Sequence, residues 1–341
     1  MFRRLRIPTV AAVAVALVAT AGATASASAP AQGGSGTVTV SGSSTVEPIT
    51  SLVGEKFSER NPDVAVRVDG PGTGDGFQLF CNGETDISDA SRAIDEEEVA
   101  ACQGNGIAYT ELKVGIDGLS VITSKDTKLN CVNFNDLYAM VGPQSEGYDW
   151  ADAQALATQL GSTTKFPKGR LEITAPGEES GTYDSFIEIA LADPAEKQVE
   201  AGAITEDQAE TTRKDYSSHA NDNAIIDGVA ETKNSIGWVG FAFADQNKDR
   251  VKILKVAGED GKCVGPSAKT VRAGSYPIAR DLFIYVNNAK AGTNASLKSF
   301  VDFYMSKQGN TSVKQADYIQ LAKADWNQSV QTWKTAAQSL G

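Results

Sequence analysis

A Ser-Gly-Thr sequence at residues 180–182 carries the residue types needed to hold an anion. It directly precedes an apolar run with helical spacing that includes Tyr183 and Phe186. The first N–H groups of a helix have no partner within the helix, so a hydroxyl or an anion at this end satisfies them. Ser180 and Thr182 therefore indicate either a turn that caps a helix or part of an anion-binding site.

Two further clusters of Gly, Ser and Thr precede helical patterns in the same way. The first, Gly-Ser-Ser-Thr at residues 42–45, follows a strand pattern, and Ser44 or Thr45 could be no more than the N-cap of the helix. The second, residues 69–76, lacks the Gly-Lys-Ser/Thr of a Walker P-loop and the later glycine of a dinucleotide fingerprint, so alone it predicts a connecting turn. Three such clusters in one chain favour an anion receptor.

Arg92 is the candidate cation for such a site. It follows a short strand pattern at residues 86–88, and its guanidinium offers a planar fork of donors suited to a phosphate-like oxyanion. A surface salt bridge is the alternative, because Asp89 and the acidic residues 96–98 are close in sequence. Its position after a strand favours the cleft, where parallel sheets bind their ligands.

The serines are poor candidates for catalytic nucleophiles. The chain has no G-x-S-x-G elbow, and its single histidine is His219. A Ser-His-Asp triad would require this one imidazole to lie against Ser44 or Ser180. We therefore expect no enzyme activity, and a hydrolase is kept only as an alternative.

Strand and helix patterns alternate along the part of the chain that carries these clusters. Apolar alternation predicts strands at residues 37–41, 64–68 and 86–88, with helical spacing between them. This β-α-β-α order predicts an α/β fold with a largely parallel sheet and helices on both faces. Further strands are expected at 119–123, 171–174 and 282–286, and the last helices at 297–305 and 313–323.

Residues 1–29 predict a signal peptide. Arginines precede an apolar core from Val10 to Val18. A membrane anchor is the alternative, but this core is too short to span a bilayer comfortably. The small residues at 25–29 fit signal-peptidase cleavage. Residues 30–36 have the composition of a flexible linker. Because the first cysteine is Cys81, no residue near the cleavage site can carry a lipid. We expect an exported protein, periplasmic, extracellular or at the cell surface, without a lipid anchor.

The chain is acidic, with a formal net charge of −12 that becomes −15 when the three arginines of the signal are removed. This balance disfavours nucleic acid and anionic membrane surfaces as partners. It does not exclude an anion ligand. Exposed charges are screened over about 8 Å at physiological salt, whereas a buried ligand responds mainly to the dipoles that line its pocket.

Four cysteines in an exported chain favour two disulfides. The short segment between Cys81 and Cys102 favours a bond between them, which would leave Cys131 to pair with Cys263. A zinc site is the alternative, but the spacings contain no C-x-x-C pair and the only histidine is distant in sequence. We therefore expect neither a metal nor another cofactor.

The order and spacing of these motifs closely resemble the phosphate-binding PstS family of ABC-importer substrate-binding proteins, from about residue 37 to the C-terminus. The resemblance implies an α/β type II periplasmic-binding-protein fold, in which two lobes with mixed, mainly parallel sheets are joined by a two-segment hinge. Lobe one would hold residues 37–116 and 279–341, and lobe two residues 117–278. The matching stretches are residues 42–46, 70–77, 86–92, 179–184, 222–225, 236–240 and 276–280.

The resemblance also implies phosphate ligands from both lobes. The Thr45 hydroxyl and the Val46 N–H would come from the first helix, Thr73 from the glycine-rich turn, and the Ser-Gly-Thr from the facing lobe. The expected phosphate-binding residues are Ser44, Thr45, Val46, Thr73, Gly74, Arg92, Glu179, Ser180, Gly181, Thr182 and Asp222.

The chain departs from the family pattern at one position that matters. Many members carry an arginine four residues before the Ser-Gly-Thr, where this chain has Pro176, and others carry an aspartate where this chain has Arg92. We infer that Arg92 supplies the guanidinium from the opposite lobe. A buried carboxylate that accepts the phosphate proton would repel sulfate; Glu179 is our first candidate and Asp222 the second, with an exposed acid on the cleft rim as the alternative for both.

The function that the resemblance implies is capture of inorganic phosphate outside the membrane and its delivery to the permease subunits of an ABC importer. The protein would act as a monomer. Two alternatives stay open: an extracellular phosphoester hydrolase that uses the same loops, and a receptor for another tetrahedral oxyanion.

Overall fold

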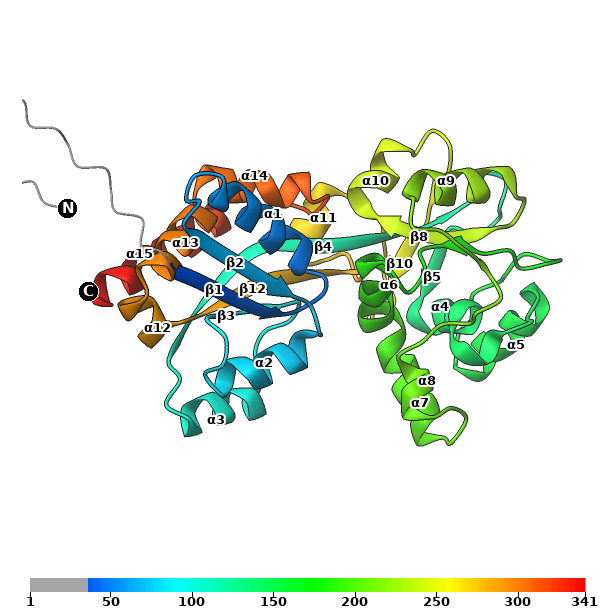
Figure 1. Cartoon of the computed structure of the whole chain (residues 1–341). Helices are drawn as coiled ribbons and strands as arrows, with labels where there is room; N and C mark the ends of the chain where they lie inside the picture. Colours follow the sequence, from blue (N-terminus) through cyan, green and yellow to red (C-terminus); the bar gives the residue numbers. More distant parts are fainter. Residues whose placement is uncertain (1–35, 341) are drawn as a thin grey trace, which may run out of the picture. The chain divides into compact units, whose positions relative to one another are not determined.

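The computed structural model describes residues 36–340. The predicted signal peptide and all but the last residue of the predicted linker lie outside this range. All described residues belong to one compact unit, residues 33–341. Within it, Figure 1 shows two α/β lobes that are joined by the long strands β4 (Tyr109–Thr123) and β12 (Ala279–Asn287).

The main sheet has seven strands and runs through both lobes. Strand β1 pairs in parallel with β2 and β3, whereas β12 pairs antiparallel with both β3 and β4, so the sheet is mixed. Strand β4 continues into the second lobe, where it pairs with β8 and with the short β9. The order is β2 (Val64–Asp69), β1 (Gly36–Gly42), β3 (Ile87–Ala90), β12, β4, β8 (Ile236–Gly240), with β9 (Lys252–Ile253) also on β4.

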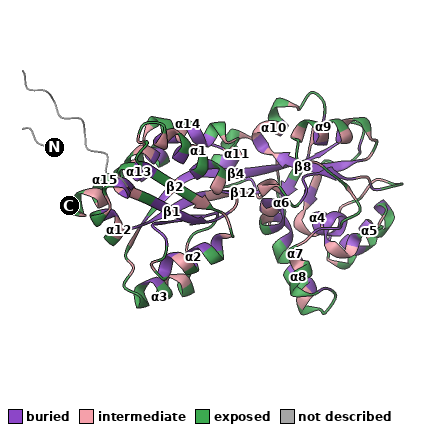
Figure 2. Ribbon diagram, viewed as in Figure 1, coloured by how far each residue is buried: buried purple, intermediate pink, exposed green. Residues whose placement is uncertain are grey.

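The helices of the first lobe cover the sheet with their apolar faces. In α1 (Glu47–Ser58) the residues Ile49, Val53 and Phe57 are buried, as the helical spacing predicts, and Pro48 occupies the first turn, where a missing N–H costs little. Figure 2 shows this arrangement as buried strands between half-exposed helices. The other helices of this lobe are α2 (Thr73–Cys81), α3 (Glu96–Gly104), α12 (Asn288–Thr293), α13 (Ala295–Tyr304), α14 (Lys307–Gln315) and α15 (Lys323–Ser339).

The second lobe packs its helices around β8. The ring of Phe186, at the end of α6 (Gly181–Phe186), stacks on Trp238 of β8 at 4.2 Å between centroids. A π-helical turn, Ile187–Leu191, follows α6 directly. The other helices of this lobe, in chain order, are α4 (Phe134–Val141), α5 (Trp150–Gln159), α7 (Ala192–Glu200), α8 (Glu206–Ala209), α9 (Asp222–Glu231) and α10 (Phe241–Gln246), and its short strands are β5 (Cys131–Asn133), β6 (Thr174–Ala175), β7 (Ser217–Ser218), β10 (Lys255–Ala257) and β11 (Cys263–Val264). Helix α11 (Ala268–Arg272) lies beside α14 of the first lobe (Figure 1), where the Arg272 side chain donates to the Gln320 carbonyl at 3.1 Å.

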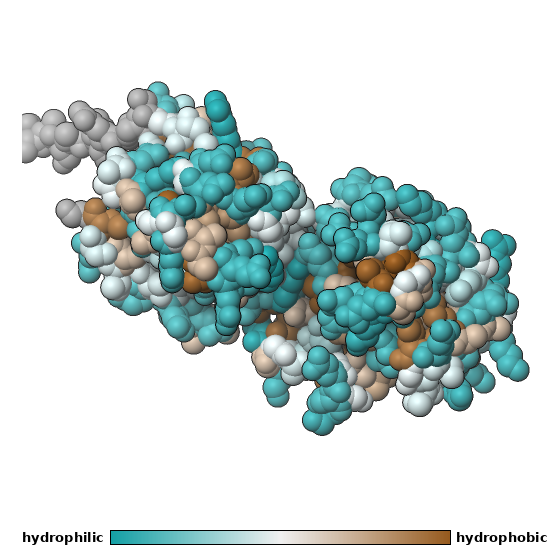
Figure 3. All heavy atoms as spheres, turned by 90° about the horizontal axis from the view of Figure 1, so that it is seen from below, coloured by the Kyte–Doolittle hydropathy of each residue, from teal (hydrophilic) through white to brown (hydrophobic). Residues whose placement is uncertain are grey.

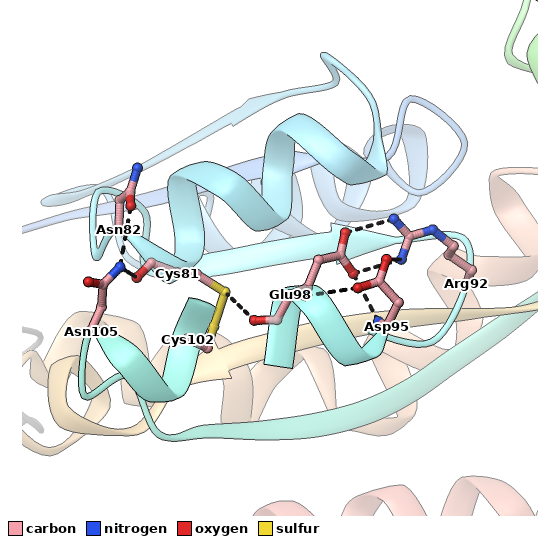
Figure 4. The surroundings of a disulfide bond; sticks show 7 residues. All are labelled: Cys81, Asn82, Arg92, Asp95, Glu98, Cys102 and Asn105. Carbon is pink, nitrogen blue, oxygen red and sulfur yellow. Dashed lines mark hydrogen bonds and ion pairs between the residues drawn. A yellow bond between two sulfur atoms is a disulfide. The ribbon is translucent and has the colours of Figure 1, made fainter. Parts of the chain in front are cut away.

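Both expected disulfides are present. Cys81 at the end of α2 bonds to Cys102 of α3, as Figure 4 shows, and Cys131 of β5 bonds to Cys263 of β11. Each bond therefore lies within one lobe and fixes two neighbouring elements.

One element differs from the sequence prediction. We expected a single helix over residues 313–323, but α14 ends at Gln315 and α15 begins at Lys323. Between them Asp317 has a φ of 66° and Ile319 forms an isolated antiparallel bridge with Ile116 of β4. A long-range backbone pairing here overrides the local helical pattern.

Candidate functional site

A cleft of about 1110 Å³ lies where the two lobes meet. Its walls include Ser44, Thr73 and Arg92 from the first lobe, Asp184 from the second, and Arg280 of β12. Figure 3 shows that mostly hydrophilic residues cover the two lobes on either side of the narrower junction. The predicted clusters at residues 42–45 and 69–76 thus contribute to one cavity.

The loop before α1 holds its own backbone donors. Ser43 accepts hydrogen bonds from the N–H of Thr45 through its hydroxyl, at 3.2 Å, and from the N–H of Val46 through its carbonyl, at 3.1 Å. Ser43 therefore closes a turn ahead of the helix, and the Val46 N–H, an expected phosphate donor, bonds to the Ser43 carbonyl in this structure. The Thr45 side chain is buried, and its hydroxyl lies 3.0 Å from that of Ser185 in the second lobe.

The N-terminus of α2 keeps its first donors free of helical bonds. The first N–H to bond back is that of Gly76, to the Gly72 carbonyl at 3.0 Å, which leaves the N–H groups of Thr73 and Gly74 without a partner in the helix. Gly72 has a φ of 116°, a conformation that favours glycine. The buried Thr73 hydroxyl lies 3.0 Å from that of Ser91, so the two hydroxyls fix each other beside the cleft.

The N-terminus of α6 faces the loop before α1 from the other lobe. Ser180 is the N-cap, and its hydroxyl accepts a hydrogen bond from the Thr182 N–H at 3.2 Å. A methyl group on Gly181 would lie 3.5 Å from the Ser44 carbonyl oxygen and 4.0 Å from the Thr45 Cα. The structure therefore brings the predicted clusters of residues 42–45 and 180–182 into contact.

Arg280 lies between these two clusters. Its guanidinium donates to the hydroxyls of Thr45, at 3.1 Å, and Ser185, at 3.3 Å, and it pairs with Glu188. Its Nε lies 3.8 Å from a carboxylate oxygen of Asp117, the residue opposite it on β4. Burial raises the pKa of the Asp117 carboxyl, while Arg280 acts in the opposite direction. This arginine therefore touches both lobes at the point where the strands cross.

The sequence analysis included Arg280 in a motif but did not choose it as a ligand. A signal was available, because this arginine stands directly before the strand pattern at residues 282–286. Its partners Asp117, Ser185 and Glu188 are remote in sequence, so only the folded chain identifies it.

Arg92 lines the cleft, but its charge is already paired. Its side chain is 44% exposed and donates twice to the Glu98 carboxylate, at 2.7 Å each, with Asp95 at 3.6 Å (Figure 4). The hydrogen bond to Glu98 raises the pKa of Arg92. The guanidinium also lies 5.6 Å from the ring of Phe77. Arg92 thus forms the surface salt bridge that was the alternative prediction, and it also lines the cleft.

The two expected proton acceptors are not among the residues that line the cleft, and neither are Thr45 and residues 180–182. Glu179 is exposed and lines a separate pocket of about 240 Å³ with Arg213 and Tyr216. Asp222 is the first residue of α9, and burial together with the charge of Asp317 raises its pKa.

Among the acidic residues that line the cleft, Asp184 is the one that a predicted cluster residue bonds across the two lobes. The Ser44 hydroxyl donates to it across the two lobes at 2.9 Å. Burial raises the pKa of Asp184, whereas the hydrogen bond from Ser44 lowers it. The sequence analysis missed this residue because Ser44 lies 140 positions away in the chain.

The geometry gives no support to a catalytic serine. His219 follows the exposed β7, and its Nε2 lies 2.9 Å from the Ser217 hydroxyl. It is not among the residues that line the cleft. Among residues 36–340, no group of three or more His, Cys, Asp and Glu side chains could hold a metal ion.

Two lobes that share two crossing strands, with hydroxyls and one guanidinium converging between them, define a two-lobed binding protein. Known proteins agree. Residues 25–308 match a family model described as a PBP superfamily domain. The chain is 36% identical over 297 residues to protein SphX of Synechococcus elongatus, covering 86% of this chain and 80% of that one. It is 32% identical over 291 residues to the phosphate-binding protein PstS of Staphylococcus saprophyticus, covering 84% and 81%.

A solved structure extends this agreement to three dimensions. The crystal structure described as that of a possible phosphate binding protein from Planctomyces limnophilus superimposes with a TM-score of 0.77 at 31% identity, over 89% of this chain and 99% of that one. The chain belongs to the PstS-type family of phosphate-binding proteins.

Proposed function

We propose that this protein binds inorganic phosphate outside the cytoplasm and delivers it to the permease subunits of an ABC importer. The observation that supports this most directly is Arg280, whose guanidinium lies between the hydroxyls of Thr45 and Ser185 from opposite lobes. A guanidinium flanked by hydroxyl and amide donors matches the oxygens of a tetrahedral anion. Phosphate-binding relatives at over 30% identity support the choice of ligand.

The ligand set that we propose keeps most of the sequence prediction and changes the cation. Thr45 and Thr73 would contribute hydroxyls. From residues 180–182, the N–H of Gly181 at the start of α6 would contribute, because those of Ser180 and Thr182 already bond within the turn. Arg280, rather than Arg92, would hold the phosphate charge, because its side chain is 17% exposed against 44% for Arg92 and because it already contacts hydroxyls from both lobes. An ion pair in a sheltered site is screened far less than one at the surface.

We further propose that Asp184 replaces Glu179 as the acceptor of the phosphate proton. Its carboxylate already accepts one hydrogen bond, from the Ser44 hydroxyl, and faces the cleft. A phosphate that keeps a proton can donate to such a carboxylate, whereas sulfate brings only acceptors and would be repelled by its negative charge.

The lobe limits of the sequence prediction, residues 37–116 with 279–341 and residues 117–278, are retained as part of the proposal. They place the change of lobe on β4 and β12, close to the pair Asp117 and Arg280. In this proposal the protein acts as a monomer and catalyses no reaction. It is exported by a signal peptide and carries no lipid anchor. None of the helices within residues 36–340 has the length and hydropathy needed to span a bilayer.

Titration calorimetry on phosphate-stripped mature protein tests the ligand. We expect one phosphate site of micromolar or better affinity and no comparable heat with sulfate, molybdate or a phosphate ester. Arg280→Ala should weaken phosphate binding by at least about a hundredfold, since two charge-assisted hydrogen bonds are lost, whereas Arg92→Ala should change it little. Heat with sulfate or molybdate and none with phosphate would overturn the assignment.

A further inference from the structure

The segment between α14 and α15 holds one side chain in a fixed place beside the cleft. Asp317 adopts a left-handed φ of 66°, which is uncommon for a residue with a side chain. Ile319 exchanges two backbone hydrogen bonds with Ile116 of β4, at 2.9 and 3.0 Å. Tyr318 stands between this strained residue and this bridge, so its backbone is held from both sides. Backbone strain of this kind persists where the surrounding structure enforces it, often at a binding site.

The Tyr318 hydroxyl lies among the groups of the proposed phosphate site. A methyl group on Gly181 would be 4.0 Å from the Tyr318 hydroxyl oxygen and equally far from the Thr45 Cα. The charges of Asp117, Arg280 and Asp184 all influence its ionisation. The hydroxyl therefore lies beside the first turn of α6, at the place where this turn faces the loop before α1.

The protonation state of Tyr318 makes it a donor. Burial raises the pKa of its hydroxyl, and the carboxylate of Asp117 raises it further, although Arg280 opposes this effect. The phenol is consequently neutral at any physiological pH, and it can donate one hydrogen bond to an anion without bringing a charge.

This hydroxyl also has no hydrogen-bond partner among the described residues, although its backbone N–H bonds to Val313. Three other tyrosines have a hydrogen-bond partner for theirs. The Tyr304 hydroxyl lies 3.1 Å from that of Thr50, Tyr285 donates to Glu111 at 2.8 Å, and Tyr216 donates to the Pro176 carbonyl at 2.7 Å. A half-buried phenol usually finds a partner, and the ligand would provide one.

We propose that Tyr318 donates a hydrogen bond from its hydroxyl to a phosphate oxygen, as a ligand contributed by the C-terminal part of the chain. This inference rests on the proposed function and adds a donor that none of the glycine, serine and threonine motifs contains. The segment between α14 and α15 is held in the first lobe by α14 and β4. Through the bound anion, the Tyr318 hydroxyl would connect this segment to the α6 turn of the second lobe.

The test is Tyr318→Phe, which removes only the hydroxyl. Phosphate titrated into this variant by calorimetry should bind about ten- to a hundredfold more weakly than to wild type, the range expected for one hydrogen bond to a charged group. Tyr276→Phe is the matched control, because that hydroxyl is also buried without a partner, and burial alone shifts its pKa. The control should bind phosphate like wild type.

A second measurement separates a ligand contact from a structural effect. Phosphate added to wild type should change the tyrosine ultraviolet absorbance, and this change should be smaller in Tyr318→Phe, while the thermal unfolding midpoints of the ligand-free proteins stay the same. Equal phosphate affinity in wild type and Tyr318→Phe would overturn this inference and leave the proposed function standing. A wild type that does not bind phosphate would overturn both.

Discussion

At the scale of single residues, the junction of the lobes brings the half-buried guanidinium of Arg280 together with several carboxylates. Arg280 has Asp117 opposite it in the sheet and Glu188 paired with it, and Asp184 faces the same cleft. Burial raises the pKa of both Asp117 and Asp184. A site with this balance favours an anion that can give a proton to a carboxylate, because a fully deprotonated anion would only add repulsion.

Asp184→Asn tests this selectivity. The amide can donate to an anion oxygen and no longer repels sulfate, so we expect the preference for phosphate over sulfate to fall by about ten- to a hundredfold, since one buried charged acceptor is worth a few kcal/mol. Competition calorimetry with the two anions measures the ratio. Glu179→Gln is the control and should keep the wild-type preference; the reverse pattern would return the role to Glu179.

Asp89 is a buried carboxyl outside the ligand set, on β3 beneath α1. Neither of its side-chain oxygens has a hydrogen bond of good geometry, and burial raises its pKa from 3.8 to about 8, helped by the charge of Glu47 on α1. On α13, the Tyr304 hydroxyl also faces it and titrates far above this range. The folded protein thus keeps a proton that the unfolded chain loses above about pH 4.

The contribution of Asp89 to the stability of the wild type should therefore be fully present below about pH 4 and fall as the pH rises toward 8. Asp89→Asn cannot ionise and should remove this slope, a difference of at most about 4 kcal/mol at pH 7. Chemical denaturation of both proteins at several pH values measures it. Parallel pH profiles would show that Asp89 ionises normally in the folded state.

The residues that sequence could find are those whose signal is local. Ser44, Thr73 and Ser180 stand in short clusters ahead of helical patterns, and the structure places each at a helix start or in the loop before one. Tyr318 stands in no such cluster, and Arg280, although it precedes a strand pattern, has its neighbours in space in distant parts of the chain. The charged side chain of a binding site is thus harder to find from sequence than the loops that supply its backbone N–H groups.

At the scale of elements, periodicity identified helices and strands well where one face is apolar. The helical spacing between the first two strand patterns predicted α1 and its buried face. Periodicity failed at residues 313–323, where the bridge between Ile319 and Ile116 interrupts the helix. Local periodicity carries no information about such a pairing, and this interruption is what positions Tyr318.

The two disulfides should contribute unequally to stability. Cys131 and Cys263 are 132 positions apart, whereas Cys81 and Cys102 are 21 apart. In the chain-entropy model the longer loop gives about 5 kcal/mol and the shorter about 3 kcal/mol. Replacing both cysteines of one pair by serine, for each pair in turn, and comparing unfolding free energies tests this order. A larger loss from the Cys81–Cys102 pair would show that local packing, not loop length, dominates.

At the scale of the whole molecule, two strands carry the connection between the lobes. Residues 109–118 of β4 pair with β12 in the first lobe, and residues 119–123 pair with β8 in the second. The register between β4 and β12 shifts near Leu282 and Phe283, a few residues from Arg280. An irregular ribbon of this kind can bend with little loss of hydrogen bonding, so we expect the lobes to move about it.

Ligand binding should therefore compact the protein, and Arg280 should control that change. Phosphate touched by Thr45 from one lobe and Gly181 from the other favours the closed arrangement by its differential affinity for it. Small-angle X-ray scattering should show a smaller radius of gyration for wild type with saturating phosphate than without. Arg280→Ala at the same phosphate concentration should keep the ligand-free radius, and Arg92→Ala should compact like wild type. An unchanged wild-type radius with phosphate bound would mean that the site is preformed and that β4 and β12 act as rigid struts rather than as a hinge.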